Sequence, residues 1–331
     1  MSRSWINQKE RSTGFWLRTI VWIALRLGRP IARALLYPIT AYFLIFADRA
    51  RQASAAYLTR IFGRPPSGRE LFRHYHTFAE ALLDRVFVFA ERDEFFQIRM
   101  HGFDLLERLI ADKQGFLLVG AHVGSFEILR GLGLRHRGLS VKALVYGENS
   151  PKINAIFRTL NPDLFKDIIP VGTASALLGL DEHIANGGVV ALLGDRSVHG
   201  EKRVLCRFLG EDAWFPAAPV LLANLFKAPV ILFFCLHKGG ADYDVHFELL
   251  AERIECSRKN RDEKIRAFMQ HYADRLEHYC RQAPYNWFNF YDFWDKSDST
   301  DEQRTSDALS PEMARNFEPR RASANRGSPA S

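Results

Sequence analysis

The sequence predicts an α/β protein in which helices flank a mainly parallel sheet. Short, continuous apolar runs at residues 116–119 and 189–193 are typical of strands buried on both faces, as the strands of parallel sheets are. These runs alternate with segments of helical apolar spacing, which favours a parallel sheet. With 47% hydrophobic and 25% charged residues in 331, the chain can build one full globular core.

The N-terminal segment, residues 1–50, is predicted to associate with a membrane. Residues 1–47 carry seven basic side chains and one acidic one, a balance of +6, and the whole chain has a net charge of +7. Leu, Ile and Phe are interleaved with these charges, whereas an arm that binds nucleic acid would be polar. The predicted partner is therefore a membrane surface, and nucleic acid is not an expected partner.

The same segment is short for a membrane-spanning helix. Its longest charge-free run, residues 34–47, would form about 21 Å of helix against a hydrocarbon core of roughly 30 Å, and Pro38 interrupts it. We favour a helix that lies in the interface or inserts partly, although snorkelling of Arg29 and Arg33 could allow a single crossing. A helix packed on the folded domain is the third alternative. The basic end is expected on the cytoplasmic face, and a cleaved signal peptide is not expected.

The remaining elements follow from apolar spacing and form one domain over residues 51–296. The expected strands cover residues 95–100, 116–119, 141–146, 168–171, 189–193, 203–208, 229–236 and 243–250. The expected helices cover residues 67–90, 104–112, 151–160, 174–186, 217–226 and 263–281, with another that begins after Ser125. Residues 297–331 are polar and poor in large apolar residues, which predicts a disordered tail.

Several polar and aromatic features are interpreted as structural. His74 and His76 have no acidic or cysteine partner at ligand spacing, so we predict surface or core-edge histidines. Residues 285–294 include seven aromatics, for which core packing is the first interpretation and a membrane-interface belt the alternative. The four cysteines are far apart, which argues against a zinc site or a disulfide framework and fits a reducing compartment.

The candidate catalytic residue is His122, at the turn that follows the apolar run 116–119. In open α/β sheets, ligands bind beyond the carboxyl ends of the strands, where this turn lies. On one continuous helix His122 and Glu127 would point roughly 140° apart, but with Gly124 relaxing the turn, Glu127 can fold back toward the ring. A carboxylate on one ring nitrogen fixes the tautomer, so that the other nitrogen can act as a general base.

The spacing of this pair is weak evidence by itself. About one His-x-x-x-x-acid pattern is expected by chance in a chain with 11 His and 38 acidic residues, and two are present. The second, His237 with Asp242, spans two glycines between expected strands, so we interpret it as solvated polarity in a hairpin turn. The position of His122 after a buried strand favours the first pattern.

These residues resemble the bacterial lipid A biosynthesis (lauroyl or myristoyl) acyltransferase family, a branch of the lysophospholipid acyltransferase superfamily. The similarity lies in the strand, the His122-x-x-x-x-Glu127 pattern and the following helix, and then in the strand ending at Asp195 and the blocks at residues 208–210 and 216–219. It covers roughly residues 15–295. It implies transfer of a fatty acyl group from a thioester donor of acyl carrier protein type to a hydroxyl of a lipid acceptor, such as a lipid A precursor, at the inner membrane.

Other charged residues are candidates for substrate binding. Asp195 and Arg196 follow a buried strand, and they form either an exposed turn with a salt bridge or part of a phosphate site. In the second case Arg196 would act with Lys202 and Arg203, because guanidinium groups bind phosphate in a bidentate manner. Arg158 is a weaker candidate for the same role.

The predicted reaction is base-catalysed acyl transfer without a covalent enzyme intermediate, a metal or a cofactor. Backbone N–H groups near Gly124 and Ser125, at the predicted helix start, are candidates for binding the substrate oxyanion. Three alternatives stay open. The acceptor could be a different lipid, such as a lysophospholipid or a polyene-type lipid; the same residues could direct water onto an ester, as in a lipid esterase; or the protein could be a membrane lipid carrier in which His122 and Glu127 are structural.

Overall fold

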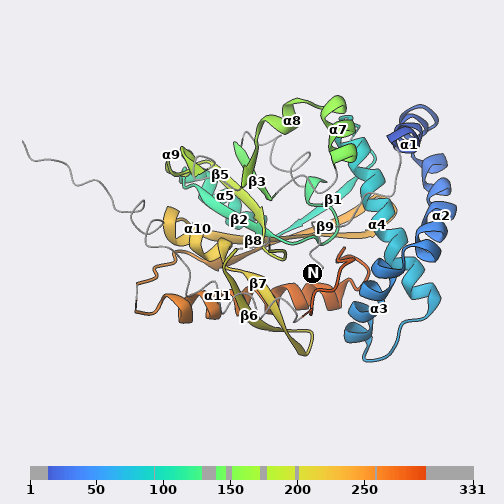
Figure 1. Cartoon of the computed structure of the whole chain (residues 1–331). Coiled ribbons are helices and arrows are strands. Elements are labelled where there is room, and N and C mark those ends of the chain that lie inside the picture. The colour runs from blue at the N-terminus through green and yellow to red at the C-terminus, as the bar shows by residue number, and fades with distance from the viewer. Residues whose placement is uncertain are drawn as a thin grey trace, which may run out of the picture. The chain divides into compact units, whose positions relative to one another are not determined.

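The computed structural model describes residues 14–92, 94–128, 139–146, 151–171, 177–197, 201–257 and 259–295 (Figure 1). The predicted tail, residues 297–331, lies outside these ranges. Within them, helices and strands alternate around one mostly parallel sheet, which confirms the predicted fold class.

A seven-stranded sheet forms the centre of the fold, in the order β1-β9-β8-β2-β5-β3-β4. Its strands are β1 (Gln97–His101), β2 (Phe116–Gly120), β3 (Val141–Tyr146), β4 (Ile168–Val171), β5 (Val189–Leu193), β8 (Val230–Gly239) and β9 (Asp242–Ala251). The five strands from β8 to β4 in this order run parallel to one another. The expected hairpin joins β8 to the antiparallel β9, and β1 pairs parallel to β9.

A separate antiparallel pair consists of β6 (Arg203–Phe208) and β7 (Glu211–Pro216). Strand β7 was not predicted, because its two leading acidic residues hide the alternation. The helices are α1 (Gly14–Leu27), α2 (Arg29–Phe46), α3 (Asp48–Phe62), α4 (Gly68–Phe89), α5 (Phe103–Ala111), α6 (Phe126–Ile128), α7 (Pro151–Leu160), α8 (Asp163–Lys166), α9 (Leu180–Ala185), α10 (Ala218–Phe226) and α11 (Arg261–Gln282). The helix expected over residues 174–186 is shorter in the structure: α9 begins at Leu180, after a turn at residues 177–179, and residues 174–176 lie outside the described ranges.

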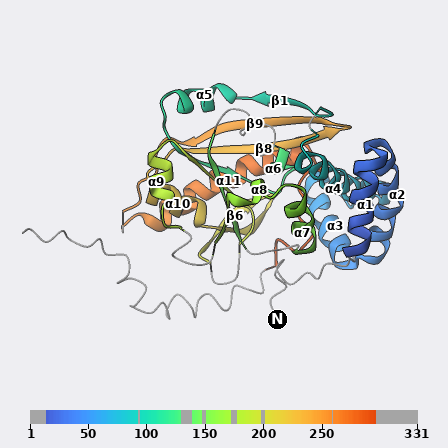
Figure 2. The ribbon, with the colours of Figure 1, turned by 90° about the horizontal axis from the view of Figure 1, so that it is seen from above.

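The core lies on both faces of the central strands, which explains their continuous apolar sequence. In β2, Leu117 and Val119 pack into a cluster that includes α10, α11 and the β6–β7 pair. Phe116 and Leu118 point to the opposite face, where they pack with residues of α5. Figure 2 shows the same sheet from above, with α5 and β1 at one edge. Because both faces of β2 are packed, the strand is held in one position within the sheet, and so is the turn that follows it.

The N-terminal segment forms two helices, α1 and α2, which pack with α4 through a third apolar cluster. Within the described residues, no single helix combines the length and apolar composition needed to cross a membrane. Helices α2 and α3 together would meet that requirement, but they are bent by 95° at their junction.

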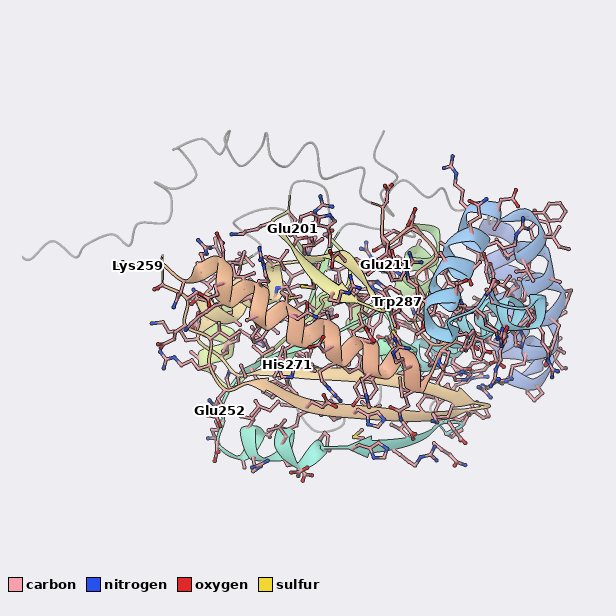
Figure 3. All side chains as sticks on the ribbon, turned by 90° about the horizontal axis from the view of Figure 1, so that it is seen from below. Glu201, Glu211, Glu252, Lys259, His271 and Trp287 are labelled. Atoms are coloured by element: carbon pink, nitrogen blue, oxygen red, sulfur yellow. The ribbon has the colours of Figure 1, made fainter. Side chains whose placement is uncertain are left out.

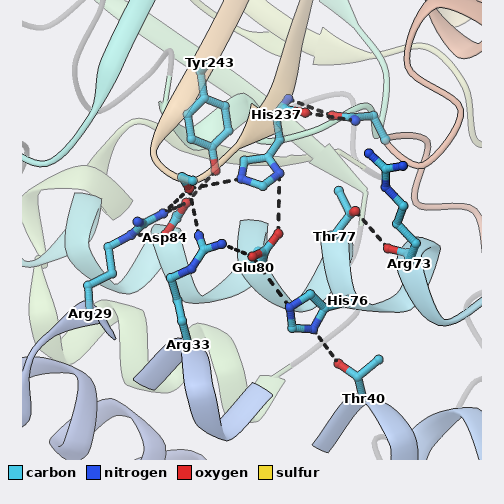
Figure 4. Close-up of polar contacts among 12 residues, drawn as sticks. Arg29, Arg33, Thr40, Arg73, His76, Thr77, Glu80, Asp84, His237 and Tyr243 are labelled. Atoms are coloured by element: carbon cyan, nitrogen blue, oxygen red, sulfur yellow. Dashed lines mark hydrogen bonds and ion pairs between the residues drawn. The ribbon is translucent and has the colours of Figure 1, made fainter. Parts of the chain in front are cut away.

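Two arginines of α2 point into the protein, where carboxylates neutralise them (Figure 4). Arg29 forms a bidentate pair with the fully buried Asp84 of α4, through Nε at 2.8 Å and Nη2 at 2.9 Å. Arg33 pairs with Glu80 of α4 and donates a hydrogen bond to the Gly240 carbonyl at 2.8 Å. The alternative in which these arginines snorkel to allow a single crossing does not fit these contacts, because their charges tie α2 to α4 and to the β8–β9 hairpin.

Two histidines are more buried than predicted. His74 is fully buried, with Nδ1 at 2.7 Å from Ser54 Oγ and Nε2 at 2.9 Å from the Trp287 carbonyl oxygen. Burial lowers its pKa to about 4, so it is neutral. His237 is also buried rather than solvated, because the start of the hairpin is covered by α4.

The aromatic run is part of the core, as first predicted. Trp287, labelled in Figure 3, is fully buried. Its ring packs edge-on against Tyr57 of α3 and Phe208 of β6. Phe293 and Trp294 are also buried in the same cluster. The alternative, an aromatic belt at a membrane interface, does not fit this burial.

Candidate active site

The site lies at the carboxyl ends of β2 and β5, which are adjacent and parallel (Figure 1). Gly120 pairs with Leu193 at the last position of the two strands. His122 lies two residues beyond the end of β2, and Asp195 lies two residues beyond the end of β5. The two side chains are therefore brought together. The His122 Nδ1 atom lies 2.8 Å from Asp195 Oδ1, and the backbone N–H of His122 donates to Oδ2 at 3.1 Å.

Asp195 is fully buried and accepts three hydrogen bonds. Besides the two from His122, the indole N–H of Trp287 donates to Oδ2 at 3.0 Å. Burial alone would raise the Asp195 pKa. Four interactions oppose burial and hold the pKa well below its ordinary value: the charge of His122, the hydrogen bond from His122, the charge of Arg196 and the hydrogen bond from Trp287. Asp195 is therefore an ionised carboxylate. The interpretation of Asp195 and Arg196 as an exposed turn is wrong.

His122 presents its other nitrogen as a base. Asp195 is ionised and can only accept, so the His122 proton is on Nδ1 and the lone pair is on Nε2. Among the described residues, none forms a hydrogen bond to Nε2, and 23% of the side chain is exposed. Burial and the nearby Arg196 charge lower the His122 pKa, although Asp195 opposes them. The ring is thus neutral at neutral pH.

Gly124 allows the turn after His122 to approach β8 closely. Its φ is +61°, and a Cβ atom at this position would lie 1.8 Å from the Cys235 carbonyl oxygen. Any other residue would clash with this backbone, which cannot move without breaking the strand. Gly124 is therefore required for the shape of the turn, and no role in binding substrate needs to be assumed for it.

Glu127 has a different partner from the one predicted. It lies in the first turn of α6 and forms an ion pair with Arg85 of α4. Arg85 in turn lies over the rings of Phe126 and Phe157, at 5.7 and 5.0 Å from their centroids. The prediction that Glu127 orients His122 is therefore wrong: the carboxylate on Nδ1 comes from the neighbouring strand.

The predicted oxyanion donors are already engaged. The Gly124 N–H donates to the Asn286 carbonyl at 2.8 Å, and the Ser125 N–H donates to the Cys235 carbonyl at 3.3 Å. The Ser125 hydroxyl is buried and has no hydrogen-bond partner within the part of the chain that the structure describes. These two backbone groups anchor the turn, and their hydrogens are not directed at a substrate.

Of the predicted phosphate ligands, the structure brings only Arg196 close to His122. Its Nη2 donates to the Phe288 carbonyl at 2.7 Å, and its charge acts on the His122 ring. Arg203 lies on β6 over the ring of Trp214, and the exposed Arg158 lies on α7 over Phe165. These two are not contacts of the His122–Asp195 pair, and their role in binding substrate stays a prediction.

Two residues at the site were not predicted. Arg85 lies in a stretch of α4 that is otherwise apolar apart from Asp84. Two adjacent charged residues in a buried helix indicate buried ion pairs. Asp84 pairs with Arg29, and Arg85 pairs with Glu127. For Trp287 the sequence predicts only core packing, because its hydrogen bond to Asp195 has no sequence signal.

One group among the described residues has metal-ligand chemistry, at the β1–β9 edge of the sheet. Ligand atoms of His101, Asp244 and His246 lie within 4.8 Å of one another. The two imidazole rings are stacked, 4.5 Å apart and 12° from parallel, so their lone pairs do not converge on one point. Arg99 already donates to Asp244 at 2.7 Å. The group fits a surface ion pair with stacked rings better than a metal centre.

The arrangement of a buried carboxylate, an oriented imidazole and a free ring nitrogen is suited to removing a proton from a hydroxyl. A comparison of the chain with curated protein sequences finds no match. The model of the bacterial lipid A biosynthesis acyltransferase family matches residues 1–296, nearly nine-tenths of the sequence and all of the described fold. The order of the blocks around His122 and Asp195 thus reflects common descent, and the chain belongs to this family.

Proposed function

We propose that the chain, an acyltransferase by its family, transfers a fatty acyl group from a thioester to a lipid hydroxyl with His122 as general base. The observation that carries the proposal is the His122–Asp195 pair, in which Nε2 is unprotonated, accessible and opposite the bonded Nδ1. Nε2 would take the proton of the acceptor hydroxyl as its oxygen attacks the thioester carbonyl. The C–S bond then breaks, and the imidazolium returns the proton to the leaving thiolate.

Asp195 would stabilise the imidazolium that exists between these two proton transfers. Its carboxylate is buried and ionised, so its charge is poorly screened and acts at short range on the ring. Glu127, through its pair with Arg85, belongs to the same site and would hold that cation near the ring.

We propose an acyl carrier protein thioester as the donor and a hydroxyl of a lipid A precursor as the acceptor, as the family name and the resemblance suggest. The test is to incubate the purified chain with an acyl thioester and a lipid A precursor in vesicles and to identify the products by mass spectrometry. The expected product is a lipid heavier by one acyl group. Free fatty acid as the main product would instead support an esterase, and no turnover with any lipid would support a carrier.

The exposed face of α2 supports association with a membrane surface, which we propose to be the cytoplasmic one. The whole of α2 is described, and none of its exposed residues carries a charge. Its large exposed side chains are Ile31, Tyr37, Tyr42, Ile45 and Phe46. On α1, the exposed Arg18, Trp22 and Arg26 follow at helical spacing. An apolar face beside an aromatic and basic one is the pattern of a helix that lies in the membrane interface.

Replacing Ile45 by aspartate is expected to weaken binding to anionic vesicles by about 10-fold or more, because it removes buried apolar area and adds a charge that the lipids repel. Ile45 is exposed in the structure, so the fold should tolerate the change. The matched control is Leu225→Asp, at a similarly exposed leucine on α10. Co-sedimentation with phosphatidylglycerol-containing vesicles measures both; equal losses in the two variants would contradict the assignment of this face.

The pH dependence of kcat/KM is expected to show a half-maximal point on the acid side below pH 6.5, the ordinary pKa of histidine. Neutral His122 is the active form, so activity is lost as the pH falls through its lowered pKa. Replacing Arg196 by glutamine removes one cause of the lowering and should move this point to higher pH. Arg203→Gln serves as control. An unchanged or lower point in Arg196→Gln would contradict this account.

A further inference from the structure

Residues 286–288, here called the C-terminal strap, bind the turn that carries His122. The Asn286 carbonyl accepts the Gly124 N–H at 2.8 Å, and the Phe288 N–H donates to the His122 carbonyl at 2.8 Å. Between them, Val123 and Trp287 form an antiparallel bridge. The strap thus acts as a short extra strand beside the turn, and it fixes the backbone of His122 from one side.

The strap is itself held from three other directions. The Asn286 side chain bonds both the N–H and the carbonyl of His237, at 2.7 and 3.1 Å. The Trp287 carbonyl accepts from His74 Nε2 on α4, at 2.9 Å. The Phe288 carbonyl accepts from Arg196. Each strap residue therefore has one contact with the His122 turn or its carboxylate and another with a rigid part of the fold.

Trp287 adds a direct contact with the carboxylate of the pair. Its indole N–H donates to Asp195 Oδ2 at 3.0 Å, while Oδ1 is left for His122 Nδ1. The side chain is fully buried among aromatic rings, so the indole cannot turn away from the carboxylate. A carboxylate that is held at Oδ2 can present Oδ1 to the ring in one orientation only.

We propose that Trp287 is a positioning residue for the reaction, whose indole N–H fixes Asp195 so that Asp195 in turn fixes His122. This inference rests on the proposed function, since it assigns Trp287 a part in the same proton transfer.

Trp294 provides a matched control. It is buried in the same aromatic cluster, 6.1 Å from Trp287 between ring centroids. Its indole N–H has no hydrogen-bond partner within the described residues. Replacing either tryptophan by phenylalanine removes similar volume from the same core, but only Trp287→Phe removes a hydrogen bond to Asp195.

In Trp287→Phe, kcat is expected to fall by about 10- to 100-fold with little change in KM, because small misplacements of a catalytic group cost up to about 100-fold. When Asp195 accepts one hydrogen bond fewer, its negative charge is less neutralised and stabilises protonated His122 more strongly. The His122 pKa then rises, and the acid side of the kcat profile should move to higher pH. Trp294→Phe should keep the wild-type profile even if it lowers the melting temperature. Benzothienylalanine at position 287, which has the indole shape but no N–H, should behave as Trp287→Phe does.

The measurement is the pH dependence of kcat for these variants, with circular dichroism to show that each is folded. A wild-type profile and kcat with benzothienylalanine at 287, or equal effects of the two phenylalanine variants, would overturn the role of Trp287. Failure of the proposed function is a separate result: it would appear as full activity in a variant without His122, whatever Trp287 does.

Discussion

Replacing His122 by alanine is expected to slow acyl transfer by about 10²- to 10⁴-fold, the usual contribution of a general base. The imidazole is the one group on the described part of the site that has an accessible basic nitrogen and a buried carboxylate behind it. Without it, the acceptor hydroxyl has to attack while still protonated. The rate is measured as lipid ester formed per unit time, by mass spectrometry, with saturating thioester and acceptor.

The control for this variant is its state of folding and its membrane binding. The His122 ring is 23% exposed, and its main contact is with Asp195, so the variant should stay folded. Vesicle binding should also be retained, because α1 and α2 are unchanged. Turnover close to that of the wild type in a folded, membrane-bound His122→Ala protein would falsify the role of His122.

Replacing Asp195 by asparagine is expected to cost up to about 10⁴-fold in kcat, the size of the effect when the carboxylate behind a catalytic histidine is neutralised, and no more than the loss of the imidazole itself. The reason lies in the hydrogen bonds at this site. Two N–H groups, from His122 and Trp287, converge on Oδ2, so the asparagine oxygen has to occupy that position. Its NH2 group then faces Nδ1 and donates to it. The ring is forced into the tautomer with the proton on Nε2, which can no longer act as a base.

Glu127→Gln is the matched control for this change, since it also replaces a buried carboxylate with its amide. Glu127 bonds Arg85 and not the His122 ring, so the tautomer is unaffected. The loss of its charge leaves the Arg85 cation unbalanced, which should lower the His122 pKa further and cost on the order of 10-fold. The sequence spacing alone predicts the reverse, that Glu127→Gln is nearly as damaging as loss of His122. A larger loss of activity in Glu127→Gln than in Asp195→Asn would support the prediction from sequence spacing, that Glu127 is the carboxylate that acts on His122.

The strands of the parallel sheet could be predicted almost to the residue. Burial of β2 and β5 leaves a continuous apolar run, and the mostly apolar segments at β3 and β4 also match the structure at both ends. Helix α3 and strand β7 are missed from the sequence: two of the four residues that α3 buries, Ala53 and Ser54, are small, and β7 begins with two acids. Apolar spacing is a weak signal where small or charged side chains interrupt the large apolar ones.

The partners of charged residues could not be predicted, because they depend on which strands are neighbours. His122 and Asp195 were both placed at carboxyl ends of buried strands, but the sequence does not state that β2 and β5 are adjacent. Spacing along the chain therefore favoured Glu127 as the partner of His122, and the adjacent strand supplied Asp195. Arg29 and Arg33 were misplaced for the same reason, since Asp84 and Glu80 lie about fifty residues away.

The central claim is that His122 and Asp195 act as one unit. The most direct measurement is kcat for His122→Ala, Asp195→Asn and the double variant under identical conditions. If Asp195 works only through the imidazole, the double variant should be as slow as His122→Ala and no slower, because residues that form one catalytic unit have non-additive effects. Losses that multiply in the double variant would show that the two residues act independently and would contradict the account.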